Sequence, residues 1–239
     1  MNERKVALIT GAARRVGAAL AREFAPDHDL LLHYGNSRVE AEALAAELSA
    51  VTRVALVSVD LRLPEAGEKL AAAARKEFTR MDLIIHNASI FAKVKFGAIT
   101  AAQLDENFAV HARAPLLLTQ AHASALRESK GNVIAIVDVG GANPWPAFLP
   151  YCASKAALES LVKGLAKALA PTVRVNGIAP GPIEPPPWYD AEDQQRAADL
   201  TLLKRWGGAG AITKAARFLN GHDFITGEIL RVDGGRHLL

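Results

Sequence analysis

The chain reads Thr10-Gly11-Ala12-Ala13-Arg14-Arg15-Val16-Gly17 directly after an apolar run at residues 6–9 and directly before a helical pattern at residues 18–24. Small residues between a strand and a helix let a phosphate approach the free N–H groups at the helix N-terminus. Two glycines six positions apart also occur in ordinary tight turns, so the strand and helix context carries the interpretation. The segment therefore predicts a dinucleotide-binding βα unit.

The same alternation of short apolar runs and longer helical patterns continues along the chain. Strands are predicted at residues 6–9, 30–33, 54–59, 83–86, 133–137, 173–178 and 229–232, and helices at residues 18–24, 39–48, 66–78, 101–126, 153–170 and 209–219. This rhythm indicates a parallel sheet, and runs that are apolar nearly throughout indicate helices on both faces. We predict an α/β fold, a doubly wound parallel sheet (Rossmann fold) in three layers, forming a single domain over residues 1–239.

Composition excludes several classes of partner. The net charge is only +3 and the basic residues are scattered, so we expect no nucleic-acid partner. Cys152 is the single cysteine and the seven histidines lack ligand spacing, which predicts neither an intramolecular disulfide nor a metal. We find no secretory signal and no apolar run long enough to cross a bilayer, which predicts no membrane association and a cytoplasmic protein.

A proline-rich segment, residues 179–189, reads APGPIEPPPWY. Prolines at this density exclude regular structure. Loops beyond the carboxyl edge of such a sheet border the ligand cleft, so we interpret the segment as a mobile flap over a ligand. A plain surface connection is the alternative.

The residues after the second predicted strand bear on the choice of cofactor. NAD-binding units carry an acidic residue there, but this chain reads His33-Tyr34-Gly35-Asn36-Ser37-Arg38 and has no carboxylate until Glu40. Arg14, Ser37 and Arg38 offer cations and a hydroxyl suited to a 2′-phosphate, which predicts NADPH. Arginines that are merely solvated are the alternative.

Tyr151 and Lys155 are four residues apart in a helical pattern and so share a face. A phenol with an ordinary pKa near 10 is a poor acid or base at neutral pH, and a nearby ammonium changes that. Lys155 could also hold the nicotinamide ribose. Alone, this spacing is common on solvated helix faces.

Taken together, these motifs resemble the short-chain dehydrogenase/reductase family, collinearly from residues 10–17 to the ITGEILRVDGG at residues 225–235. Asn107 resembles the family's helix asparagine, which anchors a water linked to the lysine, and Asn176 resembles an asparagine beside the nicotinamide. The cofactor contacts implied by the resemblance are Gly11, Arg14, Arg15, Val16, Gly17, Tyr34, Asn36, Ser37, Arg38, Asp60, Leu61, Asn87, Ala88, Ser89, Tyr151, Lys155, Pro180, Gly181 and Ile183. A homotetramer is also implied.

Two departures from the family pattern point to a subfamily. Arg15 stands in place of a glycine and Asp138 in place of the serine thirteen residues before the tyrosine. Both departures resemble pteridine reductases, as do Leu32-His33-Tyr34, Asn87-Ala88-Ser89-Ile90-Phe91 and Val137-Asp138. In that subfamily Phe91 would stack on a flat pterin, and Ser89 and Arg15 would bond the pterin edge or the cofactor phosphates. For Phe91 the alternative is core packing.

The leading hypothesis is therefore an NADPH-dependent reductase of a small-molecule pterin. An Asp138 carboxylate would keep the Tyr151 phenol protonated and offset Lys155, so that the phenol donates a proton to the ring that receives hydride. Tyr151, Lys155, Asp138 and Asn107 are the predicted catalytic residues. Asp138 as a simple loop cap, a carbonyl or 3-oxoacyl reductase, and a non-catalytic NADPH-binding regulator are the alternatives.

Overall fold

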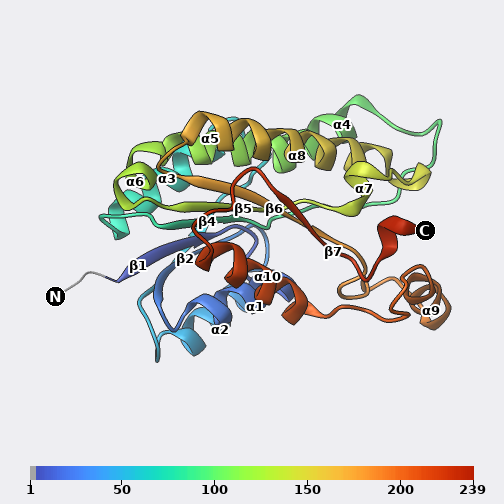
Figure 1. The fold of residues 1–239 in the computed structure, drawn as a ribbon, viewed down its shortest axis with the longest axis horizontal. Helices are drawn as coiled ribbons and strands as arrows, with labels where there is room; N and C mark the ends of the chain where they lie inside the picture. The colour runs from blue at the N-terminus through green and yellow to red at the C-terminus, as the bar shows by residue number, and fades with distance from the viewer. Residues whose placement is uncertain (1–3) are drawn as a thin grey trace.

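Seven strands form one parallel sheet in the computed structural model, which describes residues 4–239 (Figure 1). They are β1 (Lys5–Ile9), β2 (His28–Tyr34), β3 (Val54–Ser58), β4 (Leu83–His86), β5 (Asn132–Ile136), β6 (Arg174–Pro180) and β7 (Ile229–Val232). Their order is β3-β2-β1-β4-β5-β6-β7, and each pair is parallel. The order reverses between β1 and β4, where open sheets of this kind bind ligands.

Helices cover both faces of the sheet, as Figure 1 shows. One layer holds α1 (Arg15–Phe24), α2 (Arg38–Leu48) and α10 (Ala209–Gly221), and the other holds α3 (Ala66–Glu77), α4 (Ala101–Phe108), α5 (Ala114–Ala121), α6 (Ala123–Ser129) and α8 (Leu149–Leu169). The short helices α7 (Val139–Ala142) and α9 (Ala191–Asp199) follow β5 and β6. The predicted doubly wound, three-layer fold is confirmed.

Alternate side chains of the central strands pack into two separate cores. On β1, Val6 and Leu8 pack into the core under α3 and α8, whereas Ala7 and Ile9 pack into the core under α1 and α10. Leu8 and Ile9 are both fully buried. Burying one such side chain stabilises the fold by roughly 1.5–3 kcal/mol, so the sheet centre is a rigid base for the loops at its edges.

The prediction of a single helix at residues 101–126 is wrong, because the structure divides this segment. A π-helical turn, Ala109–Arg113, follows α4, and α5 and α6 come after it. Pro115 favours the first division, since it has no N–H to donate and its ring conflicts with the carbonyl group four residues earlier, whereas the second division, at His122, involves no proline. A widened turn before the proline accommodates both effects, and π turns are frequent at functional sites.

The proline-rich segment at residues 179–189 lacks regular structure, as predicted, apart from its first two residues. β6 continues through Pro180, and residues 181–190 form neither helix nor strand. Helix α9, which the sequence reading missed, then begins after Asp190, whose carboxylate accepts the Asp193 N–H at 2.8 Å. The flap therefore connects the carboxyl edge of the sheet to a capped helix.

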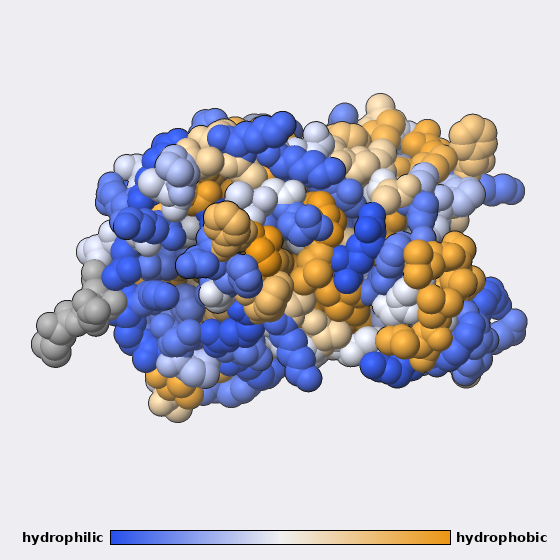
Figure 2. All heavy atoms as spheres, in the orientation of Figure 1, coloured by the Kyte–Doolittle hydropathy of each residue, from blue (hydrophilic) through white to orange (hydrophobic). Residues whose placement is uncertain are grey.

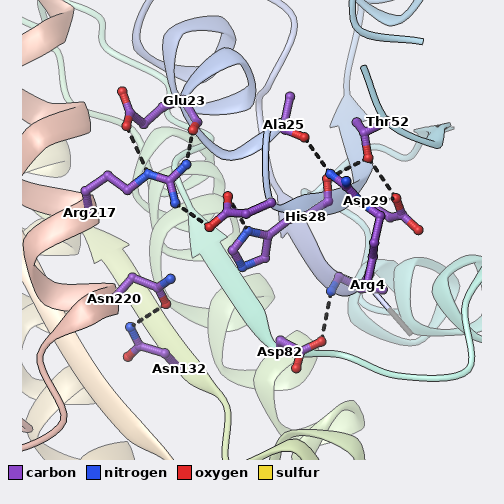
Figure 3. Close-up of polar contacts among 12 residues, drawn as sticks. Arg4, Glu23, Ala25, His28, Asp29, Thr52, Asp82, Asn132, Arg217 and Asn220 are labelled. Atoms are coloured by element: carbon purple, nitrogen blue, oxygen red, sulfur yellow. Dashed lines mark hydrogen bonds and ion pairs between the residues drawn. The ribbon is translucent and has the colours of Figure 1, made fainter. Parts of the chain in front are cut away.

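Polar contacts gather at the opposite edge, where the strands begin (Figure 3). Arg217 of α10 pairs with Glu23 at 2.9 Å and with Asp27 at 2.7 Å. Near the start of β2, Arg4 pairs with Asp29 at 3.2 Å. These contacts join helix to sheet at the amino edge and leave the carboxyl edge for the site.

Candidate active site

The glycine loop lies tightly against the end of β4. Gly11 has φ +63°, and a Cβ there would lie 2.7 Å from the Cα of Ala88. A Cβ at Gly17 would lie 2.1 Å from the Gly11 carbonyl oxygen. The Asn87 amide donates to the carbonyl oxygens of Thr10 and Gly11, both at 3.0 Å. Only glycine fits these two positions, and Asn87 holds the loop in place.

Helix α1 begins just beyond this loop with backbone donors to spare. The side chain of the N-cap residue, Arg14, accepts no hydrogen bond from the N–H groups of the first turn. The first N–H groups of a helix have no partner within it, and the helix dipole favours an anion at that end. The loop and α1 therefore form a cradle that fits the pyrophosphate of a dinucleotide.

His33 is a part of this cradle that the sequence reading named only as a motif residue. Its Nδ1 accepts the Gly11 N–H at 3.2 Å, and its Nε2 lies 2.8 Å from the Val59 carbonyl oxygen, so Nε2 carries the proton. Burial lowers the pKa of His33 and keeps the ring neutral. The imidazole thus fixes the glycine loop against β3.

The loop after β2 brings together the residues predicted to bind the adenosine end, including Tyr34, Asn36 and Ser37. Arg14 and Arg38 are exposed there and pair with Glu40 at 3.5 Å and Glu42 at 2.7 Å. Exposed ion pairs contribute little stability, so a phosphate can replace the glutamates. The two guanidinium groups are therefore available to an anionic ligand.

The remaining predicted cofactor contacts lie at the ends of two other strands, β3 and β6. After β3, Asp60 pairs with Arg62 at 2.8 Å, which holds the pKa of Asp60 low, and Leu61 is buried. After β6, Ile183 is buried and a Cβ at Gly181 would lie 2.7 Å from the Cα of Asp233. These residues line the carboxyl edge of the sheet, with Val16 and Pro180 on neighbouring segments.

Asn176, which was predicted to lie beside the nicotinamide, is within β6 rather than in the loop that follows this strand. It is fully buried, its amide donates to the Ile225 carbonyl oxygen at 2.9 Å, and its Oδ1 accepts the Glu228 N–H at 3.1 Å. It therefore ties β6 to the loop before β7.

Tyr151 and Asp138 form the central contact of the site. The phenol donates to Oδ2 of Asp138 at 2.7 Å, while Oδ1 of the same carboxylate accepts the Gly140 N–H at 2.7 Å. Asp138 therefore both caps α7 and binds the tyrosine. Lys155, only 2 % exposed, donates from Nζ to the Ile136 carbonyl oxygen at 2.7 Å and lies 5.6 Å from the Tyr151 ring centre.

Burial and charge set the protonation of this group. Burial, reinforced by the charge of Asp138, raises the pKa of Tyr151 well above 10. Burial also raises the pKa of Asp138, and it lowers the pKa of Lys155 to about 8. At neutral pH the phenol is consequently a proton donor beside a cationic lysine.

Phe91 belongs to an aromatic cluster beside this pair. Its ring is stacked on Phe148 at 4.3 Å and meets the edge of Tyr151 at 4.8 Å. Trp188, on the flap, lies 6.3 Å away at an interplanar angle of 27°, and Trp145 meets Phe91 edge-on at 6.5 Å. A flat substrate that stacks on Phe91 must share this cluster with Trp188 or displace it.

Arg15 connects the glycine loop to the flap. It adopts φ +55°, a left-handed conformation that is uncommon for a residue with a side chain, at the position of the replaced glycine. Its guanidinium donates to the carbonyl oxygens of Glu184 at 2.7 Å and Pro185 at 3.0 Å, and it lies 3.6 Å from the Glu184 carboxylate. The structure therefore places Arg15 between the cofactor loop and the segment that covers the site.

The buried neighbour of Tyr151 on the α4–α5 segment is His111 rather than Asn107. The Asn107 amide donates to the Gln103 carbonyl oxygen within α4 at 2.8 Å. His111, on the π turn, accepts the Ile90 N–H on Nε2 at 3.1 Å, and its ring centre lies 5.5 Å from that of Tyr151.

The remaining contacts of His111 define its tautomer. Nε2 also lies 3.0 Å from the Ser89 hydroxyl, and Nδ1 lies 2.8 Å from the Ser154 hydroxyl. Because Nε2 accepts, Nδ1 carries the proton. Burial lowers the pKa of His111 far below 6.5. The sequence offered only the nearby Pro115 as a sign of this arrangement.

A sheet with a phosphate cradle at its switch point and a tyrosine, lysine and carboxylate beside it defines a nucleotide-dependent oxidoreductase. Residues 11–237 match the family model described as Enoyl-(Acyl carrier protein) reductase. The chain belongs to the short-chain dehydrogenase/reductase family, as its motifs predicted.

Individual relatives cover nearly the whole chain. Dihydromonapterin reductase of Enterobacter sp. (strain 638) is 31 % identical over 97 % of this chain and 96 % of its own length. The structure of FolM alternative dihydrofolate reductase 1 from Brucella suis in complex with NADP is 33 % identical, with TM-score 0.92 over 98 % of this chain and 96 % of that one. The structure of angucycline C-6 ketoreductase LanV with bound NADP is 26 % identical, with TM-score 0.91 over the same shares of the two chains.

Within residues 4–239, no cluster of three or more histidine, cysteine or acidic side chains is arranged to hold a metal ion. In the same part of the chain, no helix has the length and apolar character needed to cross a membrane.

Proposed function

We propose that this protein is an NADPH-dependent reductase of dihydropterins. The observation that carries the proposal is the 2.7 Å hydrogen bond from the Tyr151 phenol to Asp138. A serine hydroxyl in that position would be neutral, whereas a carboxylate opposes ionisation of the phenol and so favours a proton donor. Relatives that are named dihydromonapterin reductase and alternative dihydrofolate reductase support the same substrate class.

Reduction of a ring C=N bond needs a hydride on one atom and a proton on its neighbour. NADPH supplies the hydride when it is bound. Tyr151 donates the proton, and Asp138 keeps that proton on the phenol until it is transferred. The Lys155 cation stabilises the phenolate that the transfer leaves, and Phe91 orients the flat ring by stacking. The buried cluster around Phe148 excludes water from the reacting edge.

The preference for NADPH over NADH rests on the residues that follow β2. Arg38 presents a guanidinium group there, and no residue from 33 to 38 is acidic. Arg14, in the glycine loop, adds a second guanidinium group beside Glu40 of α2. Guanidinium groups bind phosphate in a bidentate manner, whereas a carboxylate at this place would repel a 2′-phosphate. Relatives crystallised with NADP support this choice.

Steady-state assays with NADPH and three substrates, dihydrobiopterin, dihydrofolate and a simple ketone, test the proposal. We expect kcat/KM for the pterins to exceed that for the ketone, and Tyr151→Phe to lower kcat by about 10²–10⁴-fold, the range typical of a general acid. A ketone preference that survives in Asp138→Ser would instead identify a carbonyl reductase like the angucycline ketoreductase. Cofactor binding without turnover of any substrate would identify a binding protein.

We further propose that the enzyme is a homotetramer and works in the cytoplasm. Family resemblance supports the first proposal, and the low cysteine content of the chain supports the second. Sedimentation equilibrium gives the oligomeric state, and fractionation of cells that express the tagged chain gives the compartment.

A further inference from the structure

A second hollow lies beside the catalytic residues and is not used by the mechanism above. Its volume is about 330 Å³, and it is lined by Val139, Asn143, Pro144, Trp145, Leu200, Arg236, His237 and Leu239. Val139 directly follows Asp138 in the sequence. Trp145, which also lines the hollow, meets the Phe91 ring edge-on. Trp145 therefore borders both the hollow and the aromatic cluster around Phe91.

The walls of the hollow combine apolar groups with one cation. Hydrophobic side chains gather at the surface near α9 and the last residues of the chain, on the right of Figure 2. Leu200 and Leu239, which line the hollow, are 45 % and 64 % exposed. Together with Pro144 and Trp145 they form a surface suited to an aromatic or aliphatic spacer rather than to a short hydroxylated chain.

Arg236 supplies the cation. Its guanidinium carbon lies 5.3 Å from the Trp145 ring centre, a cation–π distance. No carboxylate pairs with this guanidinium among residues 4–239, although most arginines of the described chain form ion pairs. The Arg236 charge also acts on the Asp138 carboxyl, whose pKa burial raises and this charge lowers in part. A guanidinium with no ion-pair partner within about 4 Å can form a charge-assisted contact with an anion that enters the hollow.

The turn that carries Arg236 is held rigidly. Asp233 accepts the N–H groups of Gly235 at 3.0 Å and His237 at 2.9 Å, and its carboxylate lies 2.7 Å from Nδ1 of His237. A Cβ at Gly235 would lie 2.8 Å from a methyl group of Leu202. Because the turn is fixed on both sides, a ligand that reaches Arg236 loses little free energy in ordering it.

We propose that this hollow is a subsite for a pterin side chain that ends in a carboxylate, with Arg236 binding the anion and Trp145, Leu200 and Leu239 holding the spacer before it. The inference rests on the proposed pterin reductase activity and narrows its substrate class to pterins with an acidic tail, of which dihydrofolate is the available example. Arg236 would then decide between such substrates and pterins whose side chain is neutral.

The test compares wild type with Arg236→Gln, using dihydrofolate and dihydrobiopterin as substrates. Loss of one charge-assisted contact typically costs about tenfold in affinity. We expect the ratio of kcat/KM for dihydrofolate to that for dihydrobiopterin to fall about tenfold in Arg236→Gln, and Arg236→Lys to recover part of it. Arg127→Gln, an exposed arginine of α6, serves as the matched control and should leave the ratio unchanged.

A binding measurement separates this inference from the proposed function. The probe is N-(4-aminobenzoyl)glutamate, the dihydrofolate tail without a reducible ring, titrated calorimetrically into the NADPH-loaded protein. We expect binding to wild type and about tenfold weaker binding to Arg236→Gln. Turnover of dihydrobiopterin with an unchanged substrate ratio in Arg236→Gln would overturn the subsite alone, as would equal binding of the fragment to both proteins. Failure of wild type to reduce any pterin would instead overturn the proposed function.

Discussion

Replacing Asp138 by asparagine tests the electrostatic core of the mechanism. Asparagine keeps the shape of the side chain and one oxygen that can accept from Tyr151, and it removes the charge together with the oxygen that accepts the Gly140 N–H. Burial sets the pKa of Lys155 at about 8, and the Asp138 carboxylate holds it above the value that burial alone would give. Removing one nearby opposite charge typically shifts a pKa by about 1 unit or more, so we expect a value near 7 in Asp138→Asn.

The consequence for activity follows from the sign of this shift. Lys155 is required as a cation, so activity is lost as pH rises through its pKa. At pH 7.5 the protonated fraction falls from about three quarters at a pKa near 8 to about one quarter at a pKa near 7, roughly a threefold loss. The alkaline limb of kcat/KM should therefore move about one pH unit toward acid.

The assay is the rate of NADPH oxidation with dihydrobiopterin, measured between pH 5.5 and 9.5. Asp105→Asn, a change of the same type at an exposed position of α4, should reproduce the wild-type profile. If the alkaline limb of Asp138→Asn coincided with that of wild type, the reasoning that couples Asp138 to Lys155 would be refuted.

Three further predictions concern other parts of the site. Arg14→Ala combined with Arg38→Ala should raise KM for NADPH at least tenfold and leave KM for NADH nearly unchanged, because only the phosphate contacts are lost; equal effects on both cofactors would argue against a 2′-phosphate site. Phe91→Ala should raise KM for dihydrobiopterin by about 2–10-fold through loss of stacking, with little change in the NADPH dissociation constant measured by fluorescence. His111→Ala should lower the free energy of unfolding in urea by roughly 2–4 kcal/mol, because it removes the acceptor of the Ile90 N–H and the donor to the buried Ser154 hydroxyl; an unchanged denaturation midpoint would contradict the assigned contacts.

The fold could be predicted because its signals are local. Each strand is a short apolar run, and β4 and β7 begin and end at the predicted residues. The break in the helix predicted at residues 101–126 could not be predicted, since a single proline also occurs in the first turn of many intact helices. The π turn depends on how the segment packs between α8 and the end of β4, and no local pattern describes that packing.

Prediction of the site is limited in the same way, because contacts between distant segments leave no local pattern in the sequence. Tyr151, Asp138 and Lys155 lie within 18 residues, and the structure brings them together, as it does Gly11, Gly17 and Asn87. The role predicted for Asn107 rests on the resemblance to the family's helix asparagine. The structure places His111, which lies within the π turn itself, beside Tyr151.

The ion pairs between α10, α1 and the start of β2 have a practical consequence for protein engineering. Arg217 and its acidic partners lie at the amino edge of the sheet, whereas Tyr151 contacts Asp138, which follows the carboxyl end of β5. Randomised libraries aimed at heat tolerance can therefore be confined to that edge, while libraries aimed at new substrates can be confined to the opposite one, and the beneficial changes from each should combine additively.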